Sequence, residues 1–555
     1  MTNEELANIM YPDVTHDIDY YEKMYPERKL PEGAVVSRYS PSPTGECHMG
    51  SLFSSFIDEF VAKTTGGIFF FRVEDTDKKR EVPGCMHRQL RDLKQFGIVP
   101  MEGVVAATED NKYTEVGDYG PYVQSERIEI YHTYAKWLVA NDYAYPGFET
   151  PEELEIMRKN QEARKVRTGY YGAFAKYRDV SNEEKAKLIK EGHPWVLHFK
   201  SHGNYNRKIE VNDLVRGKVT FPENDMDQIL IKENGIPVYH FAHVIDDHLM
   251  HTTFVMRGEE WFPSVPLHVE LFKAFGFKMP KYAHTSVIMK VDEKTGNRRK
   301  LSKRYDPEAR MEYYHEMGVP TSAVHEYLMT LANSNFEAWR DQNPNADIYE
   351  YKFDFKKMSL SGSLFDLEKL KNISRKYIAS LSAKEVYENT VKYYNEFDKN
   401  FCNLIQKYKD YTINVLNIER EQKKPRKDYA YWSDIKNGIS YMYDELFTNI
   451  TYTWDKINNI SEIKDILNKY ISVYNDTDDK DTWFNKIKEL TDSLDGYTSN
   501  MKEYKLNPDN YKGNVSDVST VIRIALTGRD KTPDLYEIMK LLGNNRVKER
   551  FNKID

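Results

Sequence analysis

The chain of 555 residues contains few cysteines and no long apolar stretch. Its three cysteines, Cys47, Cys85 and Cys402, lie far apart, so neither a disulfide framework nor a cysteine-based zinc site is expected. No apolar run approaches the roughly 20 residues that a membrane helix needs. The first residues are acidic and hold no apolar segment, which argues against a signal peptide. We therefore expect a cytoplasmic protein with no membrane contact and no metal ligands of its own.

Positive charge is not in excess either. The formal net charge of −8 argues against a protein that coats nucleic acid nonspecifically. It does not exclude RNA binding, because binding requires a basic surface rather than a basic total. The length suggests about three to five domains.

Strands and helices alternate near the start of the chain. Residues 34–39 form a β-branched run that predicts a strand, and residues 51–63 have helical apolar spacing with Ser51 as a plausible cap. A second strand is expected at 68–74 and a second helix at 85–97. This order predicts an α/β fold with a doubly wound, Rossmann-type parallel sheet.

Later segments predict an inserted domain and a helical C-terminal region. The expected divisions are an N-terminal extension (1–30) of no assigned role, a Rossmann-type domain in two halves (31–120 and 228–290), an inserted α+β domain (121–227), a region with a basic loop (291–368) and an all-α region (369–555). No internal repeat interrupts this order.

The loop between the first strand and the first helix has the strongest local pattern. It reads RYSPSPTGECHMGS (38–51). Ligands of open α/β sheets bind at this edge, and a helix start offers N–H groups and partial positive charge to phosphate. Gly45 and Gly50 permit close approach of the backbone, and His48 adds a donor. Taken alone the loop also fits an ordinary turn, and it lacks the P-loop pattern.

A second basic loop, RRKLSKR (298–304), follows far along the chain. Lysines supply compact charges that suit a departing pyrophosphate, so this loop could close on a triphosphate held at the helix start. The alternative is a solvated basic turn.

Together the two loops resemble the paired signatures of class I aminoacyl-tRNA synthetases. PTGECHMG (43–50) resembles the HIGH element and KLSKR (300–304) the KMSKS element. SPSPTG (40–45) is similar to the bacterial-type glutamyl-tRNA synthetases, whereas the glutaminyl enzymes would show PEPNG. Further resemblances follow in the family's order: FRVEDTD (71–77), GPYVQSER (120–127), NDLVRG (212–217), MRGEEW (256–261) and RIALTGR (523–529).

The resemblance implies a glutamate–tRNA ligase. ATP, with its Mg²⁺, would activate L-glutamate to glutamyl-adenylate, and the glutamyl group would pass to the 3′-terminal adenosine of tRNA(Glu). The attacking carboxylate is already nucleophilic, so catalysis would consist of alignment and charge stabilisation. The enzyme is expected to act as a monomer.

Site residues are implied by the same resemblance. The catalytic positions are His48, Lys300 and Lys303. The ATP-binding positions are Pro41, Thr44, Gly45, His48, Gly50, Ser51, Glu260, Trp261, Ser302 and Lys303. The glutamate-binding positions are Arg38, Ser40, Ser42, Glu74, Tyr239, His243 and Arg257.

Two arginines suit a ligand with two carboxylates. Arg38 is expected to bind the side-chain carboxylate, Arg257 to make the second bidentate pair, and Glu74 to meet the ammonium group.

Two departures from the family pattern concern ligands. The inserted domain of the family often holds zinc and begins PCFCT there, whereas this chain has PGFET (146–150) and Tyr177 in place of a later cysteine, so no zinc is expected. His243 stands where the family usually has an asparagine that helps to hold the amino acid.

A basic segment in the helical region, EREQKKPRK (419–427), precedes Tyr429, Tyr431 and Trp432. Cations beside aromatic rings suit phosphate contacts and stacking on unpaired bases. The predicted tRNA-binding residues are Arg420, Lys423, Lys424, Arg426 and Lys427. The alternative is a solvated helix end beside core aromatics.

Competing interpretations remain. The loop at 40–45 argues against a glutaminyl enzyme, and the helical region argues against the truncated relative that glutamylates queuosine in tRNA. A small-molecule adenylyl-type enzyme would not need that helical region. A non-catalytic tRNA-binding paralogue is disfavoured by the intact His48, Lys300 and Lys303. Whether the enzyme also charges tRNA(Gln) stays open.

Overall fold

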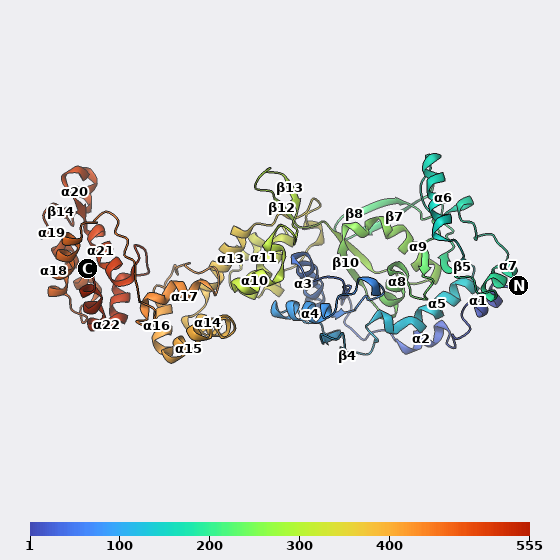
Figure 1. Cartoon of the computed structure of the whole chain (residues 1–555), viewed down its shortest axis with the longest axis horizontal. Coiled ribbons are helices and arrows are strands. Elements are labelled where there is room, and N and C mark those ends of the chain that lie inside the picture. Colours follow the sequence, from blue (N-terminus) through green and yellow to red (C-terminus); the bar gives the residue numbers. More distant parts are fainter. Residues whose placement is uncertain (555) are drawn as a thin grey trace. The chain divides into compact units, whose positions relative to one another are not determined.

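The computed structural model describes residues 1–554, which fold into two compact units (Figure 1). The first unit comprises Met1–Tyr314 and His325–Asp366, and the second comprises His315–Val324 and the residues from Leu367 onward.

A mixed sheet lies at the centre of the first unit. Its parallel strands are β1 (Val36–Tyr39), β2 (Ile68–Phe71) and β3 (Glu102–Ala107), and β4 (Tyr113–Val116) pairs antiparallel with β3. A parallel pair, β10 (Phe254–Gly258) and β11 (Lys281–Thr285), continues on the other side of β1. The N–H of Thr253 donates to the carbonyl of Val36 at 3.0 Å, so β10 begins beside β1.

Helices cover this sheet, which explains its apolar strands. The helices are α3 (Met49–Thr64), α4 (Cys85–Gln95), α8 (Tyr239–Leu249) and α9 (Val265–Phe275). Phe69, Phe70 and Phe71 of β2 are fully buried, as expected of a strand covered on both faces. The prediction of a Rossmann-like sheet is confirmed, with the difference that β4 makes the sheet mixed.

The start of α3 differs from the prediction. Its N-cap is His48, whose Nδ1 accepts a hydrogen bond from the N–H of Ser51 at 3.0 Å. The prediction that Ser51 caps the helix is therefore wrong. The imidazole of His48 accepts the capping hydrogen bond that a hydroxyl or a carboxylate usually accepts. Similarly, β2 ends at Phe71, since Arg72 and Glu74 turn to buried charged partners.

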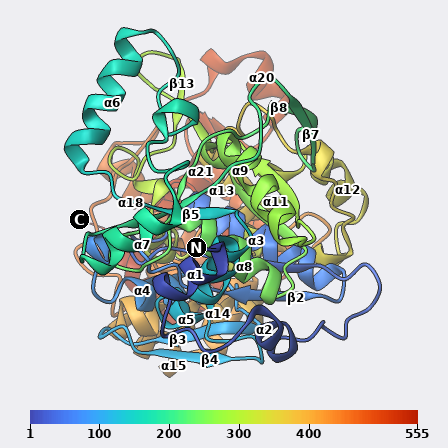
Figure 2. The ribbon, with the colours of Figure 1, turned by 90° about the vertical axis from the view of Figure 1, so that its right-hand side faces the viewer.

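The segment after β4 contains strands and helices of its own. They are α5 (Ile128–Ala140), β5 (Ala144–Gly147), α6 (Pro151–Ala163), α7 (Asn182–Lys190), β6 (Val196–Phe199), β7 (Lys208–Asp213), β8 (Gly217–Pro222) and β9 (Ile229–Ile231). β5, β6 and β9 form one sheet, and β7 and β8 form a hairpin. Both views of the ribbon show α6 extending away from the rest of the unit (Figures 1 and 2).

The N-terminal extension forms two helices, α1 (Asn3–Met10) and α2 (Ile18–Met24). α1 packs against α5 and α7 (Figure 2) and buries Leu6, Ala7 and Met10. Glu22 of α2 accepts hydrogen bonds from His248 and Tyr134, each at 2.9 Å. The extension therefore ties the segment after β4 to the helices of the central sheet.

The rest of the first unit begins with a hairpin, β12 (Met289–Val291) and β13 (Arg298–Lys300), so the first three residues of the expected basic loop are strand. Three helices follow along the chain: α10 (Met311–Met317) and α11 (Thr321–Ala332), whose residues are divided between the two units, and α12 (Phe336–Gln342) of the first unit.

The second unit is almost entirely helical, as expected. Its helices are α13 (Leu367–Ser380), α14 (Ala383–Phe397), α15 (Lys399–Lys407), α16 (Lys409–Asn417), α17 (Asp434–Ile439), α18 (Ile460–Val473), α19 (Lys480–Asp492), α20 (Met501–Leu506), α21 (Val515–Thr527) and α22 (Leu535–Asn552). Two very short strands, β14 (Tyr497–Thr498) and β15 (Gly513–Asn514), pair beside them.

Over residues 1–554, no helix has the length and apolar character required to cross a membrane.

Candidate functional site

Two cavities open near the carboxyl ends of β1 and β10. The chain leaves β1 toward β2 on one side and returns through β10 on the other, which is the switch point where open α/β sheets bind ligands. The lysine cavity, of about 540 Å³, is lined by residues that include His48, Gly50, Glu260, Lys300, Ser302 and Lys303. The arginine cavity, of about 270 Å³, is lined by residues that include Arg38, Ser40, Ser42, Glu74, Tyr239, Arg257 and Trp261. Ser54 of α3 lines both cavities, so they adjoin.

The lysine cavity joins the two loops that are distant in sequence. Nζ of Lys303 donates a hydrogen bond to the carbonyl of Glu46, just before the N-terminus of α3. Neither Lys300 nor Lys303 forms an ion pair with a carboxylate in the described part of the chain, and both are exposed. The wall therefore combines free cations with a helix N-terminus, an arrangement suited to a polyphosphate.

His48 is neutral in this setting. His48 lies at the open cavity wall. The surrounding protein atoms partly desolvate its ring, and the ammonium groups of Lys303 and Lys300 repel a proton, so the pKa of His48 falls to about 4. Because Nδ1 accepts from the N–H of Ser51, the proton of the neutral ring lies on Nε2. His48 thus presents a hydrogen-bond donor to the cavity.

A bidentate ion pair fixes the ends of the lysine-bearing loop. Nη1 and Nη2 of Arg299 donate to the two oxygens of Asp306 at 2.6 and 2.7 Å. The N–H of Ser302 donates to Asp306 at 2.9 Å. The hydrogen bond from Arg299 outweighs partial burial and holds the pKa of Asp306 below its usual value.

In the arginine cavity, Arg38 has a carboxylate partner. Its Nε donates to Asp247 at 3.2 Å, and Arg72 reaches the same oxygen at 2.8 Å. Arg72 also pairs with Glu74 at 3.2 Å. The charge of Arg38 is therefore already shared within a buried network.

Arg257 differs, because neutral groups hold it. Its Nε donates to His284 at 2.9 Å, its Nη2 lies 3.2 Å from Nδ1 of His268, and its Nη1 lies 3.5 Å from the hydroxyl of Tyr239. The guanidinium packs over the ring of Tyr282. It is 6% exposed, and no carboxylate of residues 1–554 pairs with it. A buried cation without a counter-ion is costly, so this cavity favours an anionic ligand.

His243 is the glutamate-site candidate that the structure separates from the cavity. It is fully buried, neither ring nitrogen has a hydrogen-bond partner, and its ring centroid lies 4.8 Å from that of Tyr239. Burial and nearby arginines lower the pKa of His243 well below its usual value. It packs behind Tyr239 as a neutral ring.

Four ATP-site candidates lie in the loop or helix start rather than on the cavity wall. The carbonyl of Pro41 accepts from the N–H of Glu74 at 3.0 Å, and that of Gly45 accepts from Gln89 at 2.6 Å. Thr44 is half-buried in the same loop, and the N–H of Ser51 donates to Nδ1 of His48. These residues shape the loop.

The sequence interpretation missed Arg72, Asp247, His268 and His284, all fully or almost fully buried. Two adjacent aspartates inside the apolar helix VIDDHL (244–249) were the available signal, since carboxylates are rarely buried without cations.

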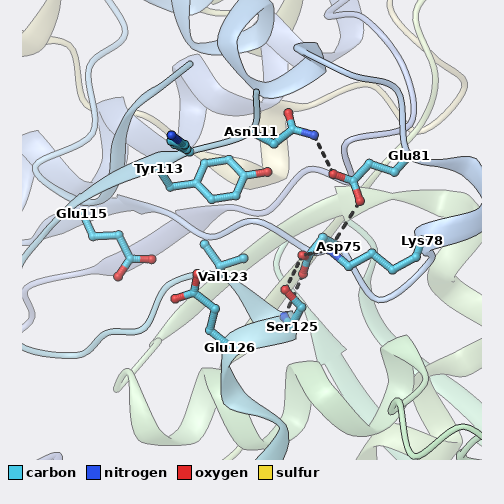
Figure 3. Close-up of a pocket in the computed structure, with 10 residues that line it drawn as sticks. Asp75, Lys78, Glu81, Asn111, Tyr113, Glu115, Val123, Ser125 and Glu126 are labelled. Carbon is cyan, nitrogen blue, oxygen red and sulfur yellow. Dashed lines mark hydrogen bonds and ion pairs between the residues drawn. The ribbon is translucent and has the colours of Figure 1, made fainter. Parts of the chain in front are cut away.

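A third cavity, of about 630 Å³, has the wrong charge for phosphate (Figure 3). Carboxylates of Asp75, Glu81, Glu115 and Glu126 line it together with Lys78 and Lys112. Asp75 accepts from the N–H and the hydroxyl of Ser125 at 2.8 and 2.5 Å, which joins the sequence patterns at 71–77 and 120–127.

The place of the expected zinc motif is occupied by an aromatic cluster. Tyr177 packs against Tyr145 and Tyr170, and His198 stacks on Tyr170 with ring centroids 4.4 Å apart. Nε2 of His198 lies 3.3 Å from Glu149. No group of three or more potential metal ligands was found over residues 1–554, and the absence of zinc stays a prediction.

The second unit contains a cavity of about 620 Å³ that is lined by cations, aromatic rings and carboxylates, among them Arg426, Lys480, Arg523, Trp483, Phe484, Glu419, Asp481 and Asp534. Arg420 is instead buried and donates to the carbonyls of Leu416, Ile378 and Leu381.

The lysines of the basic segment differ in exposure from the aromatic residues after it. Lys423, Lys424 and Lys427 are exposed, whereas Tyr431 and Trp432 are buried. The geometry favours a surface role for the lysines and a structural role for Arg420 and the two aromatics.

Comparison with known proteins gives two family matches. The family described as tRNA synthetases class I (E and Q), catalytic domain, matches residues 34–372. An anticodon binding domain matches residues 424–554.

Individual relatives are similar over the full chain. The chain is 46% identical to a glutamate–tRNA ligase of Clostridium perfringens, over 100% of this chain and 99% of that protein. It is 45% identical to one of Acetivibrio thermocellus, over 100% of both. A crystal structure of a glutamate tRNA ligase from Elizabethkingia meningosepticum in complex with its amino acid is 27% identical, with a TM-score of 0.72, over 94% of this chain and 100% of that one.

Proposed function

Because the chain belongs to the class I tRNA synthetases for glutamate and glutamine, we propose that it is a glutamate–tRNA ligase that activates L-glutamate with ATP and transfers it to tRNA(Glu). The observation that carries the choice of substrate is Arg257, a buried guanidinium without a carboxylate partner in the described chain, in a cavity adjoining free lysines.

The lysine cavity takes the triphosphate of ATP with its Mg²⁺. His48 donates from Nε2 to a phosphate oxygen, and Lys300 and Lys303 balance the charge that grows on the departing pyrophosphate. Ser302 keeps its loop anchored through Asp306. Glu260 lines the lysine cavity and Trp261 the arginine cavity, where we assign them to the adenosine side.

The arginine cavity takes glutamate. Its α-carboxylate attacks the α-phosphorus, the bond to the bridging oxygen breaks, and pyrophosphate leaves. No base is required, since the carboxylate is ionised at neutral pH. A ribose hydroxyl of the terminal adenosine then attacks the acyl carbon and AMP leaves. The shared wall at Ser54 supports this direct transfer between the two cavities.

Glutamine is rejected by charge. It nearly matches glutamate in shape but would leave the desolvated guanidinium without an anion. Discrimination built on an unpaired buried group reaches the order of 10⁴-fold.

The cavity of the second unit receives an unpaired anticodon base. Trp483 and Phe484 offer ring faces for stacking, and Arg523 offers a cation. Arg426 is exposed and pairs with Asp428 and Glu419, so it offers a second cation by exchange of these partners. Except for Glu419, the residues that line this cavity belong to the segment that matches the anticodon binding domain. A monomeric state and a cytoplasmic location stay predictions.

Aminoacylation tests the proposal. Labelled glutamate and glutamine are supplied separately with tRNA(Glu) and with tRNA(Gln). We expect glutamyl-tRNA(Glu) from the wild type, no glutaminyl-tRNA, and a large loss in Arg257→Gln. Absence of glutamyl-tRNA would refute the function. Glutamylation of both tRNAs would make the enzyme non-discriminating.

A further inference from the structure

Arg257 is held through a chain of side chains that reaches a different segment. Arg257 and His284 are paired residues on the adjacent strands β10 and β11. His284 in turn contacts Asp213, at the end of β7. All three are buried, with Asp213 4% and His284 1% exposed.

The hydrogen bonds assign the proton positions along this chain. One oxygen of Asp213 accepts from the N–H groups of Val215 and Arg216, each at 2.9 Å. The other oxygen accepts from the N–H of His284 at 3.1 Å and from its Nδ1 at 2.7 Å.

The proton of neutral His284 therefore lies on Nδ1, and the Nε2 lone pair faces the Nε–H of Arg257 at 2.9 Å. Carboxylates that fix the tautomer of a histidine ligand act in the same way at metal sites.

His268 holds the other side of the guanidinium in the same manner. Its Nδ1 accepts from Nη2 of Arg257, so its Nε2 carries the proton and donates to Nδ1 of His240 at 2.8 Å. Both partners of Arg257 are thus neutral acceptors. Arg38 and Arg72, in contrast, are held by carboxylates.

We infer that Asp213 and His284 are positioning residues of the glutamate site, which orient Arg257 through a neutral acceptor and so leave its positive charge free for a substrate carboxylate. A carboxylate in place of His284 would hold the guanidinium equally well but would neutralise it. This inference rests on the proposed function, and it assigns a role to the pattern NDLVRG (212–217), whose aspartate accepts from its own turn and from His284.

Substitutions at His284 separate charge from packing. His284→Gln keeps a neutral acceptor, and we expect the KM for glutamate to stay close to that of the wild type. His284→Glu keeps an acceptor but adds a negative charge, and we expect that KM to rise by about 10- to 100-fold, the scale known for residues that orient ligands. The KM for ATP should change little in either. If the role were only structural, the repulsion between Asp213 and the new carboxylate would disturb the packing generally, and the KM for ATP would rise together with the KM for glutamate.

Asp213→Asn tests the tautomer. The asparagine amide can donate to Nδ1, which moves the proton of His284 to Nε2, where it faces the Nε–H of Arg257. We expect a rise of about 10- to 100-fold in the KM for glutamate. The double variant Asp213→Asn/His284→Gln has no imidazole whose tautomer could change. Its KM for glutamate should therefore equal that of His284→Gln alone. Additive losses would overturn the inference.

The controls distinguish the possible failures. His325→Gln replaces a half-buried histidine outside both cavities and should leave the KM for glutamate unchanged. If the wild type forms glutamyl-tRNA and His284→Glu keeps the wild-type KM, the inference falls and the function stands. If the wild type forms none, the function falls and the inference with it. Should His284→Glu not fold, the double variant decides.

Discussion

The ammonium group of Lys303 donates a hydrogen bond to the main-chain carbonyl of Glu46, two residues before His48. This contact brings the basic loop to the N-terminus of α3, although the two segments are far apart in the sequence. The lysine cavity therefore already contains the cations, the imidazole donor and the helix start that we assign to the triphosphate.

Replacement of Lys303 by alanine tests its action in the transition state. We expect the rate of glutamyl-adenylate formation to fall by about 10²- to 10³-fold, as when one stabilising donor is removed, while the KM for glutamate changes little. Pyrophosphate exchange measured with tRNA present gives both values. Arg304→Ala, at an exposed position outside the cavity lining, is the matched control. Equal losses in rate and in glutamate affinity would contradict the assigned role.

Gly50 is predicted to tolerate no side chain. A β-carbon there would lie 2.9 Å from Cε1 of His48, so Gly50→Ala should displace the imidazole from its cap on Ser51. We expect a higher KM for ATP and a slightly lower Tm.

Gly45→Ala is the comparison for Gly50→Ala, since a β-carbon at Gly45 meets no atom within 4 Å. The Tm of Gly45→Ala should stay unchanged. A wild-type KM for ATP in Gly50→Ala would show that His48 does not contact the nucleotide.

Acid should destabilise the fold through the buried histidines. Burial, followed by the charge of Arg257, lowers the pKa of His240 to about 4, and burial lowers the pKa values of His243, His268 and His284. In the unfolded chain a histidine binds its proton near pH 6.5.

The contribution of these groups to the free energy of unfolding is therefore fully present above about pH 6.5 and is lost as the pH falls toward 4. Each contributes at most about 1.4 kcal/mol per pH unit. Urea unfolding at pH 7, 6 and 5 measures the slope, which His240→Gln should reduce and the exposed control His193→Gln should not. A stability that is constant over this range would contradict the neutral cluster.

Arg420 and Arg426 should separate stability from tRNA binding. Arg420 donates to three main-chain carbonyls, and Arg420→Ala should lower the free energy of unfolding by about 1–3 kcal/mol through the unsatisfied acceptors it leaves, with little effect on the KM for tRNA.

Arg426 lines the cavity of the second unit, and Arg426→Ala should raise the KM for tRNA and reduce its salt dependence by about one unit of log–log slope. Thermal unfolding and aminoacylation at several salt concentrations distinguish the pair. If Arg420→Ala raised the KM for tRNA without a loss of stability, Arg420 would contact the tRNA and the assignment would be wrong.

Local sequence was sufficient for the elements and loops. The apolar run at 68–74 predicted a buried strand, of which the structure keeps Ile68–Phe71. The spacing at 51–63 predicted a helix, and the Pro- and Gly-rich loop at 38–51 predicted a ligand edge. These features depend on residues that are close in the sequence, so the sequence predicts them without knowledge of the tertiary structure. The cap of α3 was misassigned because serine is a preferred N-cap residue, whereas in the structure the imidazole of His48 accepts the capping hydrogen bond.

The sequence by itself determined the order of the elements, the glycine-containing loop at 38–51, the basic loop at 298–304 and the resemblance to a family. Only the tertiary structure decided which partners hold each cation. Arg38 and Arg72 pair with the carboxylate of Asp247, Arg420 donates to main-chain carbonyls, and Arg257 has no carboxylate partner in the described chain. The reason is physical. The charge state of a buried site depends on partners that folding brings from distant segments, and no local pattern records them.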